Sequence, residues 1–271
     1  MRRSGLPILF LLVLAAACAP GATTPGAARP APSSANVHPG FDTQIYPGEA
    51  AMRAWRQSSP YRWVGYYLPA PCHRDASFSG TRESLRRMGW GMAILYVGQQ
   101  AFEGAAPPDT ASGRPIVCSR TLLTAERGRA DARDAIARTR GEGFPAGSVI
   151  YLDVERTSAV PDSLLQYYDA WTGEVLRDGS YVPGTYAHQI NAARLFAAAC
   201  AAYERAGRGG SPPFWVAGGT GFSLDQPPYA IGLTYARVWQ GVLDADRTWG
   251  GVALRVDENV SDRPDPSAPS P

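Results

Sequence analysis

Short apolar runs alternate with helical patterns from residue 38 to about residue 217 of this 271-residue chain. Short strands separated by helix-length segments are typical of βαβ units and a parallel sheet. The last two apolar runs lie too close together for a full-length helix between them. The predicted strands cover residues 38–42, 63–68, 91–97, 148–155, 182–187, 214–217, 236–240 and 252–256. The predicted helices cover residues 48–55, 82–88, 124–140, 163–176 and 191–206.

This alternation predicts an α/β fold of the (β/α)8 TIM-barrel type, irregular and β-rich at its C-terminal end. The alternative is an open doubly wound sheet. No G-x-G-x-x-G follows a predicted strand, which disfavours the nucleotide-binding version of that sheet. No G-x-S-x-G elbow is present, which disfavours an α/β-hydrolase, and the glycine-rich residues 218–221 lack the lysine of a P-loop.

The N-terminal residues predict export. Arg2 and Arg3 precede a short apolar run that ends in three alanines and Cys18, which indicates a signal peptide with a lipobox-like end. We expect Cys18 to be acylated and to anchor the protein to a membrane; cleavage by an ordinary signal peptidase, giving a periplasmic or secreted protein, is the alternative. Composition divides the chain into a signal peptide (1–18), a disordered Pro/Ala/Ser/Thr-rich tether (19–37), a barrel (38–260) and a disordered Pro/Ser-rich tail (261–271).

Charge and cysteine usage exclude several classes of function. The net charge is only +2, and no basic stripe with interleaved aromatic residues suggests nucleic-acid binding. No Cys or His pair has the spacing of metal ligands, so we expect neither a metal nor a cofactor. Cys200 falls in an apolar helix and is expected to be a buried thiol. Cys72 and Cys118 fall in loops that follow strands, and in an oxidising compartment they are expected to form a disulfide.

The predicted strand 148–155 ends in two carboxylates, Asp153 and Glu155. Side chains two apart on a strand point to the same side, so both should leave the C-terminal end of the strand together. Carboxylates at the strand ends of an α/β barrel are typical of glycoside chemistry, and two like charges at close range raise one pKa. The alternative is a solvated D-x-E at the start of a loop.

Several short motifs occur in an order that resembles a known group. The chain is similar to the glycoside-hydrolase-like domain of unknown function found in secreted bacterial proteins. That domain is similar in turn to the Chalaropsis-type lysozymes of glycoside hydrolase family 25. The resemblance covers roughly residues 38–260 and rests on Gly40-Phe41-Asp42, Asp153-x-Glu155, Pro183-Gly184-x-Tyr186, Trp215-Val216-Ala217, Trp239-Gln240 and Asp257-x-Asn259.

The resemblance implies roles for these residues. Glu155 would be the general acid. Asp153 would stabilise positive charge on a sugar ring or hold Glu155 in place, and Asp42 would be a second charge stabiliser or a base. The alternatives are a salt bridge for Glu155 and a cap of the first helix for Asp42. The implied glycan-binding residues are Tyr186, Trp215, Trp239, Gln240 and Asp257. The alternative for the three aromatic residues is core packing, and the alternative for Asp257 is closure of the barrel.

The sequence also departs from the resemblance. Gly218-Gly219 and Gly241 stand where the lysozymes often carry tyrosine, and Tyr66-Tyr67 stands where nearer relatives often have arginine before the tyrosine. Two functions therefore remain open. One is an exported glycoside hydrolase acting on peptidoglycan or a related cell-envelope glycan, and the other is a non-catalytic glycan-binding barrel tethered to the membrane. The sequence leaves the oligomeric state open.

Overall fold

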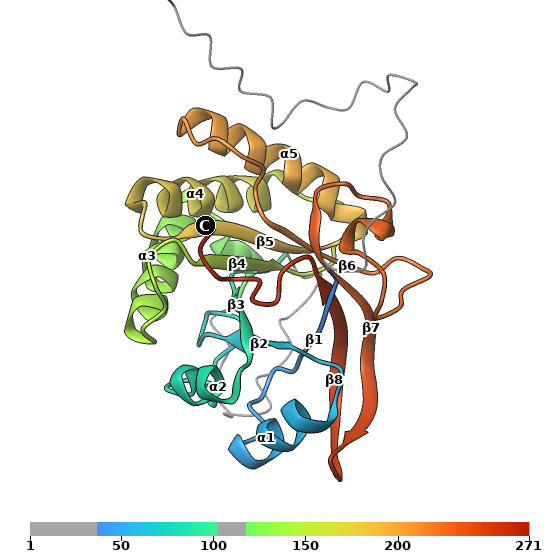
Figure 1. Ribbon diagram of the computed structural model, residues 1–271. Helices are drawn as coiled ribbons and strands as arrows, with labels where there is room; N and C mark the ends of the chain where they lie inside the picture. Colours follow the sequence, from blue (N-terminus) through green and yellow to red (C-terminus); the bar gives the residue numbers. More distant parts are fainter. Residues whose placement is uncertain (1–36, 102–117, 271) are drawn as a thin grey trace, which may run out of the picture.

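Eight strands close into a barrel in sequence order, with helices outside it (Figure 1). The computed structural model describes residues 37–101 and 118–270. Its strands are β1 (His38–Asp42), β2 (Trp63–Tyr67), β3 (Gly91–Val97), β4 (Val149–Val154), β5 (Val182–His188), β6 (Phe214–Ala217), β7 (Ala236–Trp249) and β8 (Val252–Ser261). Its helices are α1 (Glu49–Ser58), α2 (Arg82–Met88), α3 (Ala125–Gly141), α4 (Asp162–Asp178) and α5 (Gln189–Arg205). The predicted α/β barrel is confirmed.

The closing strand runs against the other seven. β1 to β7 pair in parallel, whereas β8 is antiparallel to both β7 and β1. Only Gly250 and Gly251 separate β7 from β8, and both have positive φ, 57° and 78°. A two-residue connection allows only a hairpin, and positive φ at both positions matches the twist of antiparallel strands. The predicted β-rich C-terminal end is confirmed, with both strands longer than predicted.

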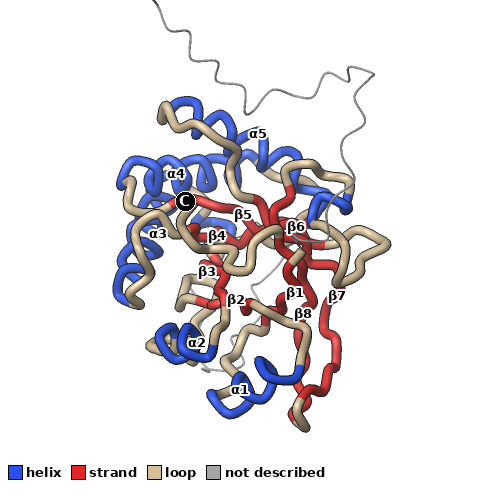
Figure 2. Tube along the Cα trace, in the orientation of Figure 1, coloured by secondary structure: helices blue, strands red, loops and turns tan. Residues whose placement is uncertain are grey.

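The helices cover the barrel unevenly. Figure 2 shows α3, α4 and α5 side by side on one flank, with α1 and α2 on another. The β7–β8 hairpin extends beyond the barrel and reaches α1, where Trp55 Nε1 donates a 3.0 Å hydrogen bond to the Val252 carbonyl. The hairpin therefore packs on the flank of the barrel where α1 lies.

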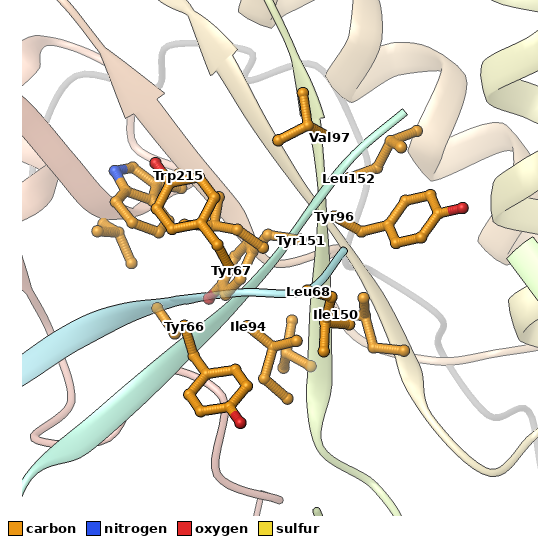
Figure 3. Packing of buried hydrophobic residues seen from close by; sticks show 14 of the residues in the cluster. Tyr66, Tyr67, Leu68, Ile94, Tyr96, Val97, Ile150, Tyr151, Leu152 and Trp215 are labelled. Atoms are coloured by element: carbon orange, nitrogen blue, oxygen red, sulfur yellow. The ribbon is translucent and has the colours of Figure 1, made fainter. Parts of the chain in front are cut away.

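Aromatic side chains fill the barrel interior. Trp215 of β6 meets Trp63, Tyr151 and Tyr186 edge to face, with ring centroids 5.4, 5.8 and 5.4 Å apart. Such edge-to-face pairs are a favoured aromatic geometry. Figure 3 shows Trp215 and Tyr151 inside this cluster, and Tyr66 pointing to the opposite side of β2 from Tyr67. Strand alternation thus sends every second side chain inward, and the inward ones below the mouth are packed core.

The C-terminal segment is ordered, which corrects the predicted disordered tail. Ser261 completes β8, and residues 262–270 cross the end of the barrel where the parallel strands begin. The Ser267 carbonyl accepts from Val149 N at 2.9 Å, and Ser267 N donates to the Met92 carbonyl at 3.0 Å. Ser267 is 2% exposed. The prolines give this segment a disordered composition, but its main chain pairs with the first residues of β3 and β4.

Ser267→Ala is expected to lower the free energy of unfolding by about 2 kcal/mol. Ser267 Oγ accepts from Ile94 N at 2.8 Å and donates to the Val149 carbonyl at 2.8 Å, so alanine leaves two buried main-chain groups unpaired. Urea denaturation measures the loss, with the exposed Ser270→Ala as the control. Equal stability of wild type and Ser267→Ala would show that the hydrogen bonds of the Ser267 hydroxyl do not stabilise the fold.

The predicted signal peptide, Cys18 and tether residues 19–36 lie outside the described residues. Across the two described ranges, none of the helices combines the length and the apolar character needed to cross a membrane.

Candidate active site

Four carboxylates meet at the mouth of the barrel, where the parallel strands end. Asp42 is the last residue of β1, Asp153 lies near the end of β4, and Glu155 follows that strand directly. Asp257 joins them because β8 runs the other way and pairs Asp257 with Asp42. The structure therefore brings together the three predicted catalytic residues and Asp257.

Asp42 is held by hydrogen bonds on both of its oxygens. Tyr67 Oη donates to Oδ1 at 2.7 Å, and Asn259 Nδ2 and Gln240 Nε2 donate to Oδ2 at 2.8 and 2.9 Å. Glycine at position 65 leaves room for it, because a Cβ there would lie 2.6 Å from Asp42 Cβ. The alternative role as a helix cap is wrong, since Gly48 precedes α1 and no side chain caps it.

Burial and a neighbouring charge raise the pKa of Asp42 to about 7. Removal from water is the larger cause, the charge of Asp257 adds to it, and the three hydrogen-bond donors oppose it. Asp42 is 3% exposed, so it is screened little by solvent. The mouth of the barrel therefore favours protonation of its carboxylates well above the ordinary range of aspartate.

Asp153 is the least satisfied carboxylate of the group. It is 5% exposed, and its Oδ1 accepts no hydrogen bond from the part of the chain that the structure describes. Burial raises its pKa well above the ordinary value, and the charges of Glu155 and Asp42 raise it further. The charge of Glu155 is thus close enough to raise the pKa of Asp153, in agreement with the predicted proximity of these two carboxylates.

Glu155 is half-buried and reaches the mouth from the first position after β4. Burial raises its pKa, the main-chain N–H of Arg156 opposes that change, and the charge of Asp257 adds to it. Within the described ranges no arginine forms an ion pair with Glu155, so the salt-bridge alternative is not observed. A raised pKa and partial exposure together suit a group that delivers a proton.

Asp257 is fixed by an irregularity in β7. Asp244 has a positive φ of 53°, the β7–β8 register shifts beside it, and its N–H donates to Asp257 Oδ1 at 2.7 Å. Gln240 Nε2 donates to Asp257 Oδ2 at 3.1 Å and so links Asp257 to Asp42. Bulges commonly redirect side chains beside functional sites, and here the bulge supplies a main-chain donor.

The predicted aromatic residues divide between mouth and core. Tyr186 is half-buried at the mouth, and its hydroxyl donates to Gln240 Oε1 at 2.6 Å. Trp215 and Trp239 have no exposed surface, so neither offers a face to a sugar ring. Trp215 donates from Nε1 to Asn259 Oδ1 at 2.9 Å, and Trp239 donates to the Gly218 carbonyl at 2.7 Å. Trp215 lies in the packed interior of the barrel, which agrees with its core alternative. Trp239 alternates with the inward Gln240 and packs against Phe222 on the other face of β7, so it is buried outside the barrel interior.

Sequence reasoning did not select several residues of the site. Tyr67 and Asn259 hold Asp42. Gln100 accepts from the Glu155 N–H, and Asn191 accepts from the Thr157 N–H. Tyr67 and Asn259 each lie on a strand that also reaches the mouth, which is the signal that could have found them. Gln100 and Asn191 bind main-chain atoms, and no residue spacing predicts such contacts.

The predicted disulfide lies beside the mouth. Cys72 and Cys118 are bonded, with their Cα atoms 4.9 Å apart, and Cys200 is buried as predicted. Cys72 N donates to the carbonyl of Val97, the last residue of β3. Over residues 37–101 and 118–270, no three His, Cys, Asp or Glu side chains are arranged to hold a metal ion.

Asp153→Asn is expected to stabilise the fold at pH 8 and to leave stability unchanged at pH 4. A pKa raised in the folded state means that the folded protein binds the proton more tightly, so stability is present at low pH and is lost as the pH rises through the raised pKa. The amide removes that loss. Denaturant unfolding of wild type and variant across this range measures the difference. A constant difference at all pH values would show that Asp153 titrates normally.

Comparisons with known proteins agree with this fold. A solved structure of an uncharacterised protein from B. stearothermophilus is similar at 20% identity, covering 83% of this chain and 96% of that one, with a TM-score of 0.56. The spore cortex lytic enzyme SleM of Clostridium perfringens is similar at 13% identity, covering 86% and 69%, with a TM-score of 0.51. The modular autolysin LytC of Streptococcus pneumoniae is similar at 14% identity and a TM-score of 0.51; the match covers 83% of this chain but 46% of LytC.

These structural similarities show a shared barrel fold. The comparison with curated proteins gives no match. A family model described as "Rv2525c-like, glycoside hydrolase-like domain" matches residues 53–261. That range includes Asp153, Glu155 and Asp257, and it covers most of the chain. The chain belongs to the Rv2525c-like family of glycoside hydrolase-like domains.

Proposed function

We propose that this protein is an exported glycoside hydrolase that acts on peptidoglycan or a related cell-envelope glycan. The observation that carries the proposal is the convergence of Asp42, Asp153, Glu155 and Asp257 at one mouth, where burial and mutual repulsion raise their pKa values. Glycoside hydrolysis needs a protonated acid and a negative environment for the developing oxocarbenium ion. SleM and LytC support the choice of substrate, and LytC has also been solved in complex with a synthetic peptidoglycan ligand.

The contacts suggest a division of roles. Glu155 is the most accessible predicted catalytic residue with a raised pKa, and it would donate a proton to the leaving oxygen. Within the described ranges one carboxyl oxygen of Asp153 has no hydrogen-bond partner, and in its ionised form Asp153 would stabilise positive charge on the sugar. Asp42 already accepts three hydrogen bonds, so we assign it to charge stabilisation and not to proton transfer.

Incubation with purified peptidoglycan tests the proposal. New reducing ends should accumulate with wild-type protein and not with a double variant carrying Glu155→Gln and Asp153→Asn. Absence of new reducing ends with wild type, on peptidoglycan and on other envelope glycans, would reject the hydrolase.

The second candidate is a non-catalytic glycan-binding barrel, and the burial of Trp215 and Trp239 favours it. With Gly218, Gly219 and Gly241 at positions where the lysozymes often carry tyrosine, the described mouth lacks the predicted tryptophan platforms. A binding barrel would co-sediment with insoluble peptidoglycan without cleaving it, and Glu155→Gln would leave its affinity unaltered.

We also propose that Cys18 is acylated and holds the protein at a membrane. Cys18→Ser should move the protein from the membrane fraction to the soluble fraction of the cell envelope or to the medium, because it removes the acyl acceptor. Immunoblots of fractionated cells measure this change, with Ser33→Ala in the tether as the control. Unchanged fractionation of the Cys18 variant would favour ordinary signal peptidase cleavage.

A further inference from the structure

A buried side-chain amide continues the sheet where β3 has ended. The last β3–β4 pair joins Val97 and Asp153, and β4 ends one residue later. Beyond that pair, Gln100 Nε2 donates to the Asp153 carbonyl at 2.8 Å, and its Oε1 accepts from Glu155 N at 3.0 Å. Gln100 is 1% exposed. Its amide therefore makes the two hydrogen bonds that a further residue of β3 would make.

A second amide holds the same segment from the other side. Asn191, in the first turn of α5, is 2% exposed. Its Oδ1 accepts from Thr157 N at 3.1 Å, and its Nδ2 donates to the Thr157 carbonyl at 3.1 Å. Both amides thus bind one main-chain donor and one main-chain acceptor. Glu155 is thus held at its own main-chain nitrogen by Gln100 and lies two residues before Thr157, which Asn191 holds.

This double clamp has a clear physical consequence for Glu155. Residues 155–157 leave β4 without regular secondary structure, and a free loop samples many backbone conformations. Four hydrogen bonds from buried amides restrict those conformations and thereby fix where the Glu155 side chain starts. The titratable groups that it faces are Asp153 on β4, Tyr186 on β5 and Asp257 on β8.

We propose that Gln100 and Asn191 are positioning residues that set the direction of the Glu155 carboxyl at the barrel mouth. They act through the main chain and do not touch the reacting atoms. The expected change in kcat rests on the proposed function. The expected change in the titration of the Glu155 carboxyl rests on the geometry alone.

Gln100→Met and Asn191→Leu test the proposal, because each replaces the amide by an apolar side chain of similar length. If the protein cleaves peptidoglycan, each variant should lower kcat by about 10²-fold and leave KM unchanged, since a displaced acid impairs the chemical step and not binding. The alkaline limb of the kcat profile should move to lower pH, because a loosened Glu155 gains solvent and its pKa returns towards the ordinary value.

Ser267→Ala is the matched control. Its hydroxyl also bridges β3 and β4 by one donated and one accepted main-chain hydrogen bond, but at the opposite end of the barrel. It should reduce stability without changing kcat or the pH profile. If Gln100→Met and Asn191→Leu behave as Ser267→Ala does, the amides are only structural and the proposal is overturned.

Carboxyl-¹³C NMR titration of Glu155 gives a readout that does not need activity. Glu155 should titrate at lower pH in Gln100→Met and Asn191→Leu than in wild type and Ser267→Ala. If wild type is inactive and the two variants still show this shift, the hydrolase is rejected and the positioning role is kept. Identical titration in all four proteins would overturn the positioning role. If the two variants fail to fold, amide hydrogen exchange in wild type decides: slow exchange at Glu155 and Thr157 supports the clamp, and fast exchange overturns it.

Discussion

Glu155→Gln is expected to lower the rate of glycan cleavage by about 10²- to 10⁴-fold while the protein stays folded. The amide has nearly the shape of the protonated acid, but it cannot transfer a proton to the leaving oxygen. The half-buried position tolerates the neutral side chain, because burial and Asp257 already disfavour the charged form. Reducing-end release from peptidoglycan measures the rate, and circular dichroism confirms the fold.

Glu204→Gln is the control for that experiment, because Glu204 is exposed at the end of α5. It should cleave at the wild-type rate. Wild-type activity in Glu155→Gln would remove Glu155 from the mechanism and direct attention to Asp153, whose pKa is also raised.

Replacement of both Cys72 and Cys118 by serine is expected to lower the free energy of unfolding by about 4 kcal/mol. The disulfide joins residues 46 positions apart, and opening a loop of that length increases the entropy of the unfolded chain. Urea denaturation with and without reductant measures the effect. Reductant should destabilise wild type and leave the double variant unchanged.

Cys200→Ser is the matched control, since Cys200 is outside the disulfide. Its unfolding should keep the sensitivity to reductant that the Cys72 and Cys118 variant loses. The disulfide also lies next to the end of β3, where Ser119 N donates to Gln99 Oε1 at 3.0 Å. Equal stability of wild type and the double cysteine variant would show that the native contacts close this loop without the disulfide.

The fold could be predicted because each strand and helix has its own local pattern. The apolar run that ends at Asp153 and the alternating segments around it specify β4 and its neighbours whatever their partners are. The direction of β8 was not predicted, because that would have required recognising Gly250-Gly251 as a hairpin turn. The ordered tail could not be predicted, because Pro and Ser dominate residues 261–271 and the stabilising contact of Ser267 is with strands more than a hundred residues away.

The candidate site was predicted in its charged residues and not in their surroundings. Asp153-x-Glu155 follows from the two-residue repeat of a strand, and Asp42 follows from the resemblance. Burial of Trp215 depends on which layer of the barrel its strand reaches, and the sequence does not show that layer. Gln100 binds main-chain atoms of another segment, so neither its residue type nor its position in the sequence identifies it as part of the site.

The direction of β1 has a consequence for how the domain would be attached at a cell surface. β1 begins at His38 and ends at Asp42, so the chain enters the barrel at the end opposite the carboxylates. With Cys18 acylated, the anchored segment would join the barrel at the end opposite the carboxylates, and the point of attachment would leave the mouth unobstructed. If the Pro-rich composition of residues 19–37 gives an extended chain, about 3.1 Å per residue corresponds to a reach of roughly 60 Å. Lengthening or shortening that segment would then change how far from the membrane the carboxylates can reach.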